Sequence, residues 1–423
     1  MADKITNYKC PACTGPLHFA GTSGNLECEY CGSSFTVKEV EDLYANADAN
    51  AEAAMAAGND EWEQLAEEWS GGEGMKVYKC PSCTAELVYD ETTAATSCPY
   101  CGNPTIVPGQ FSGMLKPDFI IPFKLEKSAA IQALKNHYGN KTLLPKAFKD
   151  QNHIEEIKGL YVPFWLYDGI ASGDMTYEGR KITTEKKGEY EIKTIDHYDV
   201  ARKGDLKFEK IPADASSKMP DDLMDSIEPY DYSALTDFSK AYLAGYIADK
   251  YDVSAEDDAV RAVARAKAST RRALKADVTG FDEVEEKTGN VNVKQGKISY
   301  ALFPVWLLNT KWNGENYMFA MNGQTGKLVG DLPEDKNKAT TIFLGILAAC
   351  VILGYLLFES FIGGAVVGAI LAFVIVGGMK SALKSVHTAS AADNYSDVAG
   401  VNVTHRQQNF THQTTEKRKI ENN

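Results

Sequence analysis

Eight of the nine cysteines in this 423-residue sequence fall in four Cys-x-x-Cys pairs. The pairs make two modules of identical spacing, C-x2-C-x14-C-x2-C. The metal ligands that we predict are Cys10, Cys13, Cys28 and Cys31 in the first module and Cys80, Cys83, Cys98 and Cys101 in the second. Two residues between cysteines let one tight turn present both sulfur atoms to a single ion, and four thiolates complete a tetrahedral Zn²⁺ site. Because no position is left for a water molecule, we expect two structural zinc ions and no catalytic one.

The two modules are copies of one device. The first contains "YKCPACTGPL" at residues 8–17 and the second "YKCPSCTAEL" at 78–87. Each module is too short to fold on an ordinary hydrophobic core, so metal binding and folding should be linked. We therefore predict a zinc ribbon over residues 1–38 and another over 76–110. Redox dithiols and an iron–sulfur site are the alternatives for such cysteine pairs.

Charge indicates what the ribbons bind. The net charge of the chain is −14, and each ribbon is neutral by itself, because Lys residues balance Asp and Glu over 1–38 and over 76–116. Binding to phosphate groups requires an excess of positive charge. The sequence therefore favours protein partners over nucleic acid.

The segment between the ribbons, residues 39–75, is an acidic linker that contains no Lys or Arg. Its Ala- and Glu-rich composition is compatible with a helix, and Trp62 and Trp69 recur at helical spacing. A solvated spacer and a short partner-binding helix are both open interpretations.

Two apolar runs, residues 341–358 and 361–379, are separated only by Glu359 and Ser360. A membrane span needs about 20 residues, so we predict a transmembrane hairpin over residues 340–380. The basic residues beside the hairpin lie before the first run and after the second: Lys336, Lys338, Lys380 and Lys384. The positive-inside rule then places both termini in the cytoplasm, in a multi-pass protein of the cell membrane with two spans. A buried helix pair in a globular protein is the alternative.

Most of the remaining mass lies in residues 117–333. Here "GLYVPFWLYDG" (159–169) is echoed by "SYALFPVWLLNT" (299–310), and each reads as a buried strand with a Pro-x-Trp step. Each strand follows a stretch with helical character, at 126–138 and 254–278 respectively, and Ser254 is suited to cap the second helix. We therefore predict an α+β domain of two related units, with both Trp side chains in its core.

The last residues, 381–423, are polar, and we predict a flexible tail. The sequence contains no G-x-x-x-x-G-K-[ST], H-E-x-x-H or G-x-S-x-G motif. We therefore expect no catalytic residues and no enzyme activity, and a hydrolase with scattered catalytic groups is a third class of function to weigh. The predicted fold is thus multi-domain: two small zinc ribbons with four cysteine ligands each, an α+β soluble domain with an internal repeat, and a two-helix transmembrane hairpin.

Several motifs together resemble a family of bacterial double zinc-ribbon membrane proteins, the YdjG type. Besides the paired ribbons and the hairpin, they are "FSKAYLAGYIADKYDV" (238–253), "GLYVPFWLYDG" (159–169) and "FAMNGQTGKLVGDLP" (319–333). The resemblance covers residues 76–380. Members are often labelled transcription-factor-like zinc-ribbon proteins or primosomal helicases, but this sequence lacks the phosphate-binding loop that a helicase needs.

The resemblance implies a function in envelope stress. In that family the genes commonly sit beside those of SPFH-domain (flotillin- or stomatin-like) and phage-shock-protein-A-like proteins. We therefore expect a cytoplasm-facing, membrane-anchored scaffold whose zinc ribbons recruit such partners. The alternative is a membrane-tethered nucleic-acid-binding regulator, for which fragment 1–116 should shift nucleic acid on a gel at low salt.

Overall fold

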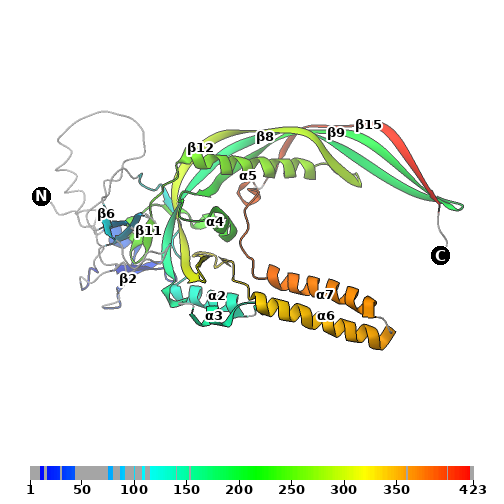
Figure 1. Ribbon diagram of the computed structural model, residues 1–423. Coiled ribbons are helices and arrows are strands. Elements are labelled where there is room, and N and C mark those ends of the chain that lie inside the picture. The colour runs from blue at the N-terminus through cyan, green and yellow to red at the C-terminus, as the bar shows by residue number, and fades with distance from the viewer. Residues whose placement is uncertain are drawn as a thin grey trace. The chain divides into compact units, whose positions relative to one another are not determined.

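The structure is a computed structural model of the chain (Figure 1). It describes residues 10–13, 17–28, 31–42, 75–79, 86–90, 100, 107–109, 115–139, 141–151, 154–358, 361–397 and 399–419. The chain divides into two compact units. The first unit consists of residues 1–164, 216–252 and 300–388, and the second of residues 165–215, 253–299 and 389–423. The α+β region predicted as one domain, 117–333, therefore contributes to both units.

The first cysteine module is built on a three-stranded antiparallel sheet of order β1-β2-β3. The strands are β1 (Leu17–Ala20), β2 (Asn25–Cys28) and β3 (Ser34–Thr36). Residues 37–42 are helical and start with a capping box, in which Glu39 N donates to Thr36 Oγ1 (3.2 Å) and Thr36 N donates to Glu39 Oε2 (2.8 Å). The predicted acidic linker thus begins as helix, and its residues 43–74 lie outside the described part of the chain.

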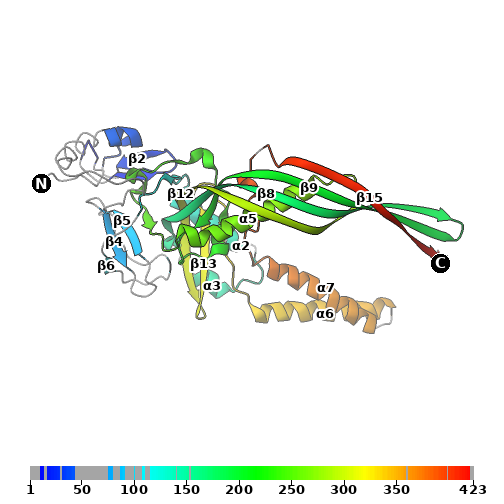
Figure 2. The same ribbon diagram turned by 90° about the horizontal axis from the view of Figure 1, so that it is seen from above.

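The second cysteine module contributes three neighbouring strands (Figure 2). They are β4 (Met75–Lys79), β5 (Glu86–Asp90) and β6 (Val107–Gly109). Strand β5 pairs antiparallel with β11 (Ile247–Asp249). These strands therefore extend the main sheet. Its order is β10 (Thr236–Asp237), β7 (Phe119–Ile120), β12 (Glu283–Trp312), β8 (Lys158–Lys187), β11, β5, β4 and β6.

One arrangement of short strand, helix and long strand occurs twice along the chain. The first has β7 (Phe119–Ile120), α2 (Lys127–Gly139) and β8 (Lys158–Lys187), and the second has β11, α5 (Ala255–Ala276) and β12 (Glu283–Trp312). Strand β12 lies parallel to β7, and β8 lies parallel to β11. Each long strand therefore pairs with the short strand of the other half.

The two Pro-x-Trp steps occupy corresponding places in this arrangement. Trp165 Nε1 donates to Val253 O (2.9 Å) just before α5, and Trp306 Nε1 donates to Leu125 O (3.0 Å) just before α2. Both Trp side chains are buried, as the sequence predicted. The Ser254 cap is also confirmed, because its Oγ accepts a hydrogen bond from Asp257 N (3.2 Å).

The first unit has further elements besides the two long apolar helices described below. They are α3 (Lys146–Gln151), η1 (Ile154–Glu156), α4 (Asp221–Ile227), η2 (Tyr232–Ala234), β10 (Thr236–Asp237), η3 (Lys240–Leu243), β13 (Glu315–Asn322) and β14 (Leu328–Val329). Strands β13 and β14 form an antiparallel hairpin. The aromatic core includes Phe123, whose ring stacks on Tyr246 at 4.0 Å and meets Trp306 edge-on.

The second unit is a sheet of long strands in the order β12-β8-β9-β15, with β9 spanning Tyr190–Asp214. Helix α5 runs along one face of these strands (Figure 1). Alternate β8 side chains such as Ala171, Met175 and Tyr177 are buried, as expected for a sheet with one covered face. A Cβ at Gly173 would overlap Leu274 Cδ1 of α5, so the absence of a side chain there allows the helix to approach.

The prediction of a flexible tail over 381–423 is corrected. Strand β15 (Asn402–Lys419) pairs antiparallel with β9 from Asn402 opposite Asp205 to Lys419 opposite Tyr190. A 3-10 turn, η4 (Asp393–Tyr395), precedes it. The strand escaped detection because both of its faces are polar and exposed, so it lacks the alternation of apolar and polar residues that marks a half-buried strand.

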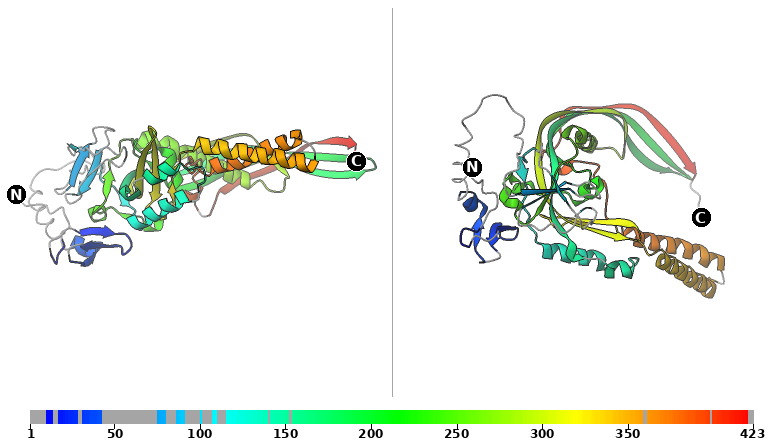
Figure 3. Two further views of the ribbon diagram at one scale, coloured as in Figure 1. Left: turned by 60° about the horizontal axis from the view of Figure 1, so that its bottom comes forward. Right: turned by 60° about the vertical axis from the view of Figure 1, so that its left-hand side comes forward.

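Helices α6 (Lys336–Phe358) and α7 (Phe361–Ser381) lie side by side (Figure 3). Both are long and apolar enough to cross a membrane. Their contact uses a stripe of small side chains on α7, Gly364, Gly368, Ala372 and Val376, which is buried. A Cβ at Gly368 would lie 2.8 Å from Cys350 Cβ of α6. Small residues therefore let the two helices pack closely.

Candidate metal centre and the segment that holds it

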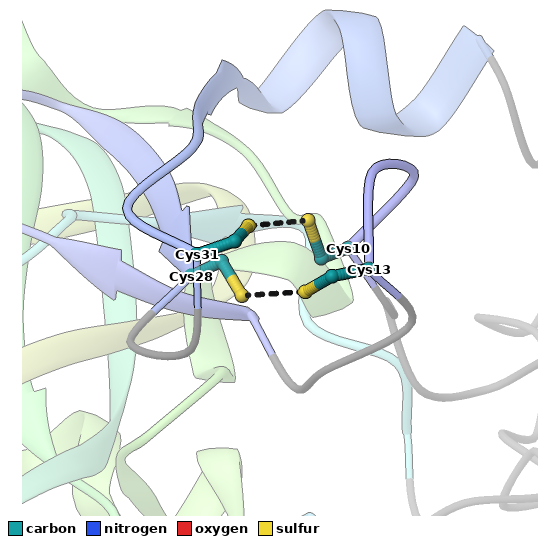
Figure 4. Close-up of side chains that lie close together, drawn as sticks. All are labelled: Cys10, Cys13, Cys28 and Cys31. Carbon is teal, nitrogen blue, oxygen red and sulfur yellow. Dashed lines mark hydrogen bonds between the residues drawn. The ribbon is translucent and has the colours of Figure 1, made fainter.

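The four cysteines of the first module converge (Figure 4). Cys10 Sγ lies 3.5 Å from Cys31 Sγ, and Cys13 Sγ lies 3.4 Å from Cys28 Sγ. All four sulfur atoms lie within 4.8 Å of one another. A tetrahedral Zn²⁺ with Zn–S bonds of about 2.3 Å would place its sulfur ligands about 3.8 Å apart. The cluster therefore fits a single ion of this kind.

Each half of the cluster is presented by a tight turn. After Cys10, the N–H of Ala12 donates to Cys10 Sγ at 3.4 Å. In the second turn, Gly32 N donates to Cys28 O at 2.8 Å, and Gly32 has φ +72°, a left-handed conformation that glycine adopts without strain. The Cys-x-x-Cys-Gly pattern thus sets the backbone that brings the thiols together.

The cluster also favours the thiolate form that metal binding requires. Hydrogen bonding with Ser33, whose Oγ lies 3.2 Å from Cys31 Sγ, lowers the pKa of Cys31 to about 6. Zn²⁺ would add its own positive charge and hold all four ligands deprotonated. The first predicted set, Cys10, Cys13, Cys28 and Cys31, can therefore bind a metal ion.

The second predicted set, Cys80, Cys83, Cys98 and Cys101, lies outside the described residues. Its neighbours in the chain are described: β4, β5, β6 and Tyr100. The structure therefore shows where this module contacts the rest of the first unit. The second zinc ion stays a prediction.

The first module shares its hydrophobic core with residues 238–253, which we call the docking segment. Phe19 and Leu26 from the module pack in one buried cluster with Ala241 and Ala244 from the segment. Phe19 N also donates to Ala244 O (3.1 Å), and the Phe19 ring meets Tyr242 edge-on at 5.1 Å. The module alone is too small to bury these side chains, so the docking segment completes its core.

Contacts outside the docking segment hold the same module. Thr22 Oγ1 donates to Glu126 Oε1 at 2.6 Å. A Cβ at Gly21 would overlap Phe123 O, so only glycine permits this approach of the two backbones. A hollow of about 270 Å³ remains beside the contact, lined by residues that include His18, Glu27, Lys127 and Trp306.

The second module uses the other half of the docking segment. Val88 and Leu87 of β5 pair with Ala248 and Asp249 of β11. Lys250 Nζ forms an ion pair with Glu86 Oε2 at 3.2 Å. One continuous segment of 16 residues therefore carries both cysteine modules, the first on η3 and the second on β11.

Asp249 is the charged group at the centre of this contact. The hydroxyl groups of Tyr100 and Ser216 both donate to its Oδ2, the latter at 2.6 Å. The side chain is buried, and burial raises the pKa of Asp249 to about 7, although the two hydrogen bonds oppose the shift. Tyr100 stands between Cys98 and Cys101 in the sequence, so this contact joins the second metal motif to the main sheet.

Sequence reasoning used the docking segment only as a mark of resemblance and missed its role. The available signal was its composition, because four aromatic and four alanine or glycine residues make up half of residues 238–253. Such a stretch has more apolar surface than one short strand would bury. Asp249 could not be singled out, because only the fold shows that its neighbours are buried hydroxyl groups.

The two apolar helices end on the same part of the first unit. Asp331 Oδ1 accepts hydrogen bonds from Ser385 N (2.9 Å) and Val386 N (3.2 Å), and Leu332 N donates to Leu383 O (2.9 Å). Ser226 of α4 then holds the chain after α7, since its Oγ donates to His387 O at 2.7 Å. The beginning of α6 and the end of α7 are thus joined to each other and to the body of the unit.

These features define a class: an α+β protein with a cysteine cluster that can hold a metal and two long apolar helices. The chain is 32% identical over 342 residues to the uncharacterized protein YdjG of Bacillus subtilis (strain 168), a match that spans 81% of this chain and 94% of that relative. The chain belongs to the YdjG family. No protein-family model and no solved structure matches it.

Proposed function

We propose that this protein is a membrane-anchored scaffold whose zinc-bound modules recruit protein partners on the cytoplasmic side. The observation that carries the anchor is the exposed apolar surface of α6 and α7. Leu356, Ile362 and Phe373 are 70%, 80% and 75% exposed. Apolar patches of this extent are covered in a cell by lipid or protein, and helices of this length suit a bilayer of about 30 Å.

The attachment of the α6–α7 hairpin to the first unit supports the proposed orientation. Both of its ends are joined to the first unit, so the body of that unit lies at one membrane face when the helices cross. Lysines flank these ends, and the connecting residues 359–360 include no Lys or Arg. The positive-inside rule then assigns that face, and both termini, to the cytoplasm. Cysteine modules that hold zinc as thiolates suit the same reducing compartment.

The attachment of both modules to the docking segment supports a recruiting role. Both modules contact one docking segment. A partner that binds both modules therefore gains affinity, because the second binding event is intramolecular. SPFH-domain and phage-shock-protein-A-like proteins, which the family resemblance implies, are the first partners to test. The response that they serve, envelope stress, belongs to the same proposal.

The anchor is tested by deleting the hairpin. A chain that lacks residues 336–381, joined by a short Gly-Ser linker, should move from the alkali-resistant membrane pellet to the soluble fraction, whereas the full chain should stay in the pellet. A matched control deletes residues 402–419 and keeps the hairpin; it should stay with the membrane. If the hairpin deletion stays in the pellet, the anchor is elsewhere and the proposal fails.

A further inference from the structure

The sheet of the second unit ends in two open edges. Within the described residues, β15 pairs only with β9, and residues 283–299 of β12 pair only with β8. An edge strand presents a row of unpaired backbone N–H and C=O groups, which another strand can satisfy. Both edges belong to long, exposed strands.

The regular part of the β15 edge is its second half. The β9–β15 register shifts between Val403 and His405 and again between Phe410 and His412. From His412 to Lys419 the pairing is unbroken. Bulges discourage strand addition, so residues 412–419 are the part of this edge that can accept a further strand.

The two edges run in opposite directions. Asp282 N donates to Arg180 O, and Thr176 Oγ1 donates to Thr288 O, so β8 and β12 are antiparallel. Strand β9 follows β8 through the tight turn at Gly188, and β15 is antiparallel to β9. Directions therefore alternate across the sheet. If a second copy continues the sheet, its β12 meets β15 as an antiparallel neighbour.

Side chains can be assigned to faces by their contacts. His197 contacts Glu178 Oε1 (2.9 Å) and Thr414 Oγ1 (3.0 Å), and Lys287 Nζ contacts Glu178 Oε2 (2.6 Å). Thr414 and Lys287 therefore share the face opposite α5. Because side chains alternate, Glu416 and Arg418 lie on this face of β15, and Glu285 lies on it in β12. Glu286 and Lys417 lie on the other face, where Glu286 pairs with Arg271 of α5. Alternation in β12 breaks after Lys287, because Thr288 Oγ1 lies 2.6 Å from Thr176 Oγ1 and so shares the face opposite α5.

Charge selects one register among those that keep the faces matched. With Glu285 opposite Arg418, Glu286 falls opposite Lys417 and Lys287 falls opposite Glu416. All three are pairs of opposite charge, and Val284 then meets Lys419. A shift by two residues in either direction places Glu285 opposite Glu416 or Lys287 opposite Arg418, which are like-charge pairs. Directly opposed charges of unlike sign stabilise antiparallel strands, and like charges destabilise them.

We propose that strand β12 of one copy adds to strand β15 of a second copy, antiparallel, with residues 284–287 opposite residues 416–419. The contact uses two different surfaces, so the first copy keeps its β15 edge free and the second keeps its β12 edge free. Repeated addition then gives a ring or a filament and not a closed two-fold dimer. The proposal goes beyond the proposed function and does not depend on the membrane anchor.

The register is tested by cross-linking between copies. In the zinc-loaded full-length protein in detergent, Val284→Cys with Lys419→Cys should give disulfide-linked dimers and higher oligomers on mild oxidation. Each single variant controls for the native cysteines. Val284→Cys with Lys417→Cys keeps the face but shifts the register by two, and it should cross-link at least fivefold less. Equal yields from the two pairs, or no oligomers from the first, would overturn the proposal.

Charge reversal supplies a second readout that does not rely on cysteine. Lys417→Glu/Arg418→Glu and Glu285→Lys/Glu286→Lys should each raise the dissociation constant of self-association at least tenfold in sedimentation experiments at low salt. A mixture of these two variants should associate again, because the unchanged β12 edge of the first meets the unchanged β15 edge of the second, and the two reversed edges are also complementary. Lys186→Glu/Lys187→Glu, of equal charge change outside both edges, should behave as wild type. Self-association that survives both reversals, or a mixture that stays dissociated, contradicts the proposal.

Discussion

At the scale of single residues, Asp249 makes stability depend on pH. Its pKa is raised to about 7 by burial, well above the value of about 3.9 for an unfolded aspartate. The unfolded chain therefore loses this proton near pH 4 while the folded chain keeps it until about pH 7. The stability that depends on the protonated form is complete below pH 4 and is lost as pH rises towards 7.

Asp249→Asn should remove this dependence, because an amide oxygen can still accept hydrogen bonds from Tyr100 and Ser216 and never ionises. We expect the stability of the variant relative to wild type to increase from pH 5 to pH 8 by roughly 3 kcal/mol, because the pKa of about 7 lies two units above pH 5 and each unit corresponds to about 1.4 kcal/mol. Thermal unfolding at both pH values measures the difference. Asp237→Asn, at an exposed position in β10, is the control. An equal gain at both pH values would show that Asp249 is ionised in the folded protein.

Trp165 and Trp306, which occupy corresponding places in the two halves, give a second prediction at this scale. Trp165→Phe and Trp306→Phe each keep an aromatic ring but remove the hydrogen bond to Val253 O or Leu125 O. Each should cost about 1–2 kcal/mol of unfolding free energy, since a buried carbonyl group loses its donor. Denaturant titration measures both. A large cost at one position and none at the other would argue against equivalent roles.

At the scale of elements, the first module and the docking segment should behave as one structure. Removing metal with a strong chelator should speed hydrogen exchange by at least tenfold in residues 17–28 and also in residues 239–246, because Ala241 and Ala244 lose the module that covers them. Strand β13, in the same unit but outside this contact, is the internal control. Faster exchange confined to residues 17–28 would show that the docking segment does not sense the metal.

The helix pair offers a matched test of its packing. Gly368→Leu puts a side chain where a Cβ already lies 2.8 Å from Cys350 Cβ, and we expect a loss of about 1–3 kcal/mol in hairpin stability. At Gly345 a Cβ would meet nothing within 4 Å, so Gly345→Leu should be near neutral. Unfolding by a denaturing detergent, followed by Trp fluorescence or helix content, measures both. Equal losses would contradict the packing of these helices.

Elements that carry strong local signals could be predicted from the sequence. The cysteine spacing identified the first metal cluster, the apolar runs identified α6 and α7, and the Ser254 cap identified the start of α5. Strand β15 could not be found in this way, because it pairs with β9, a strand far earlier in the chain, and neither of its faces is apolar. The docking role of residues 238–253 was hidden for a similar reason, since it depends on contacts distant in sequence.

At the scale of the whole molecule, the proposed function combines two helices long enough to cross a membrane, one docking segment that contacts both cysteine modules, and a recruited partner. Loss of zinc at either module should then change the set of proteins that co-purify with this chain from the membrane. Cys350 in α6 lies outside both modules, so Cys350→Ser removes a thiol without touching a predicted ligand.

The most direct test is a mild-detergent pull-down of the tagged full-length chain from bacterial membranes, read by mass spectrometry. Wild type is compared with Cys10→Ser/Cys13→Ser, Cys80→Ser/Cys83→Ser and the Cys350→Ser control. We predict protein partners, with SPFH-domain or phage-shock-type proteins foremost, that wild type and the control retain and that at least one module variant loses. An unchanged partner set in both module variants, or nucleic acid as the only material that depends on the modules, would contradict the scaffold.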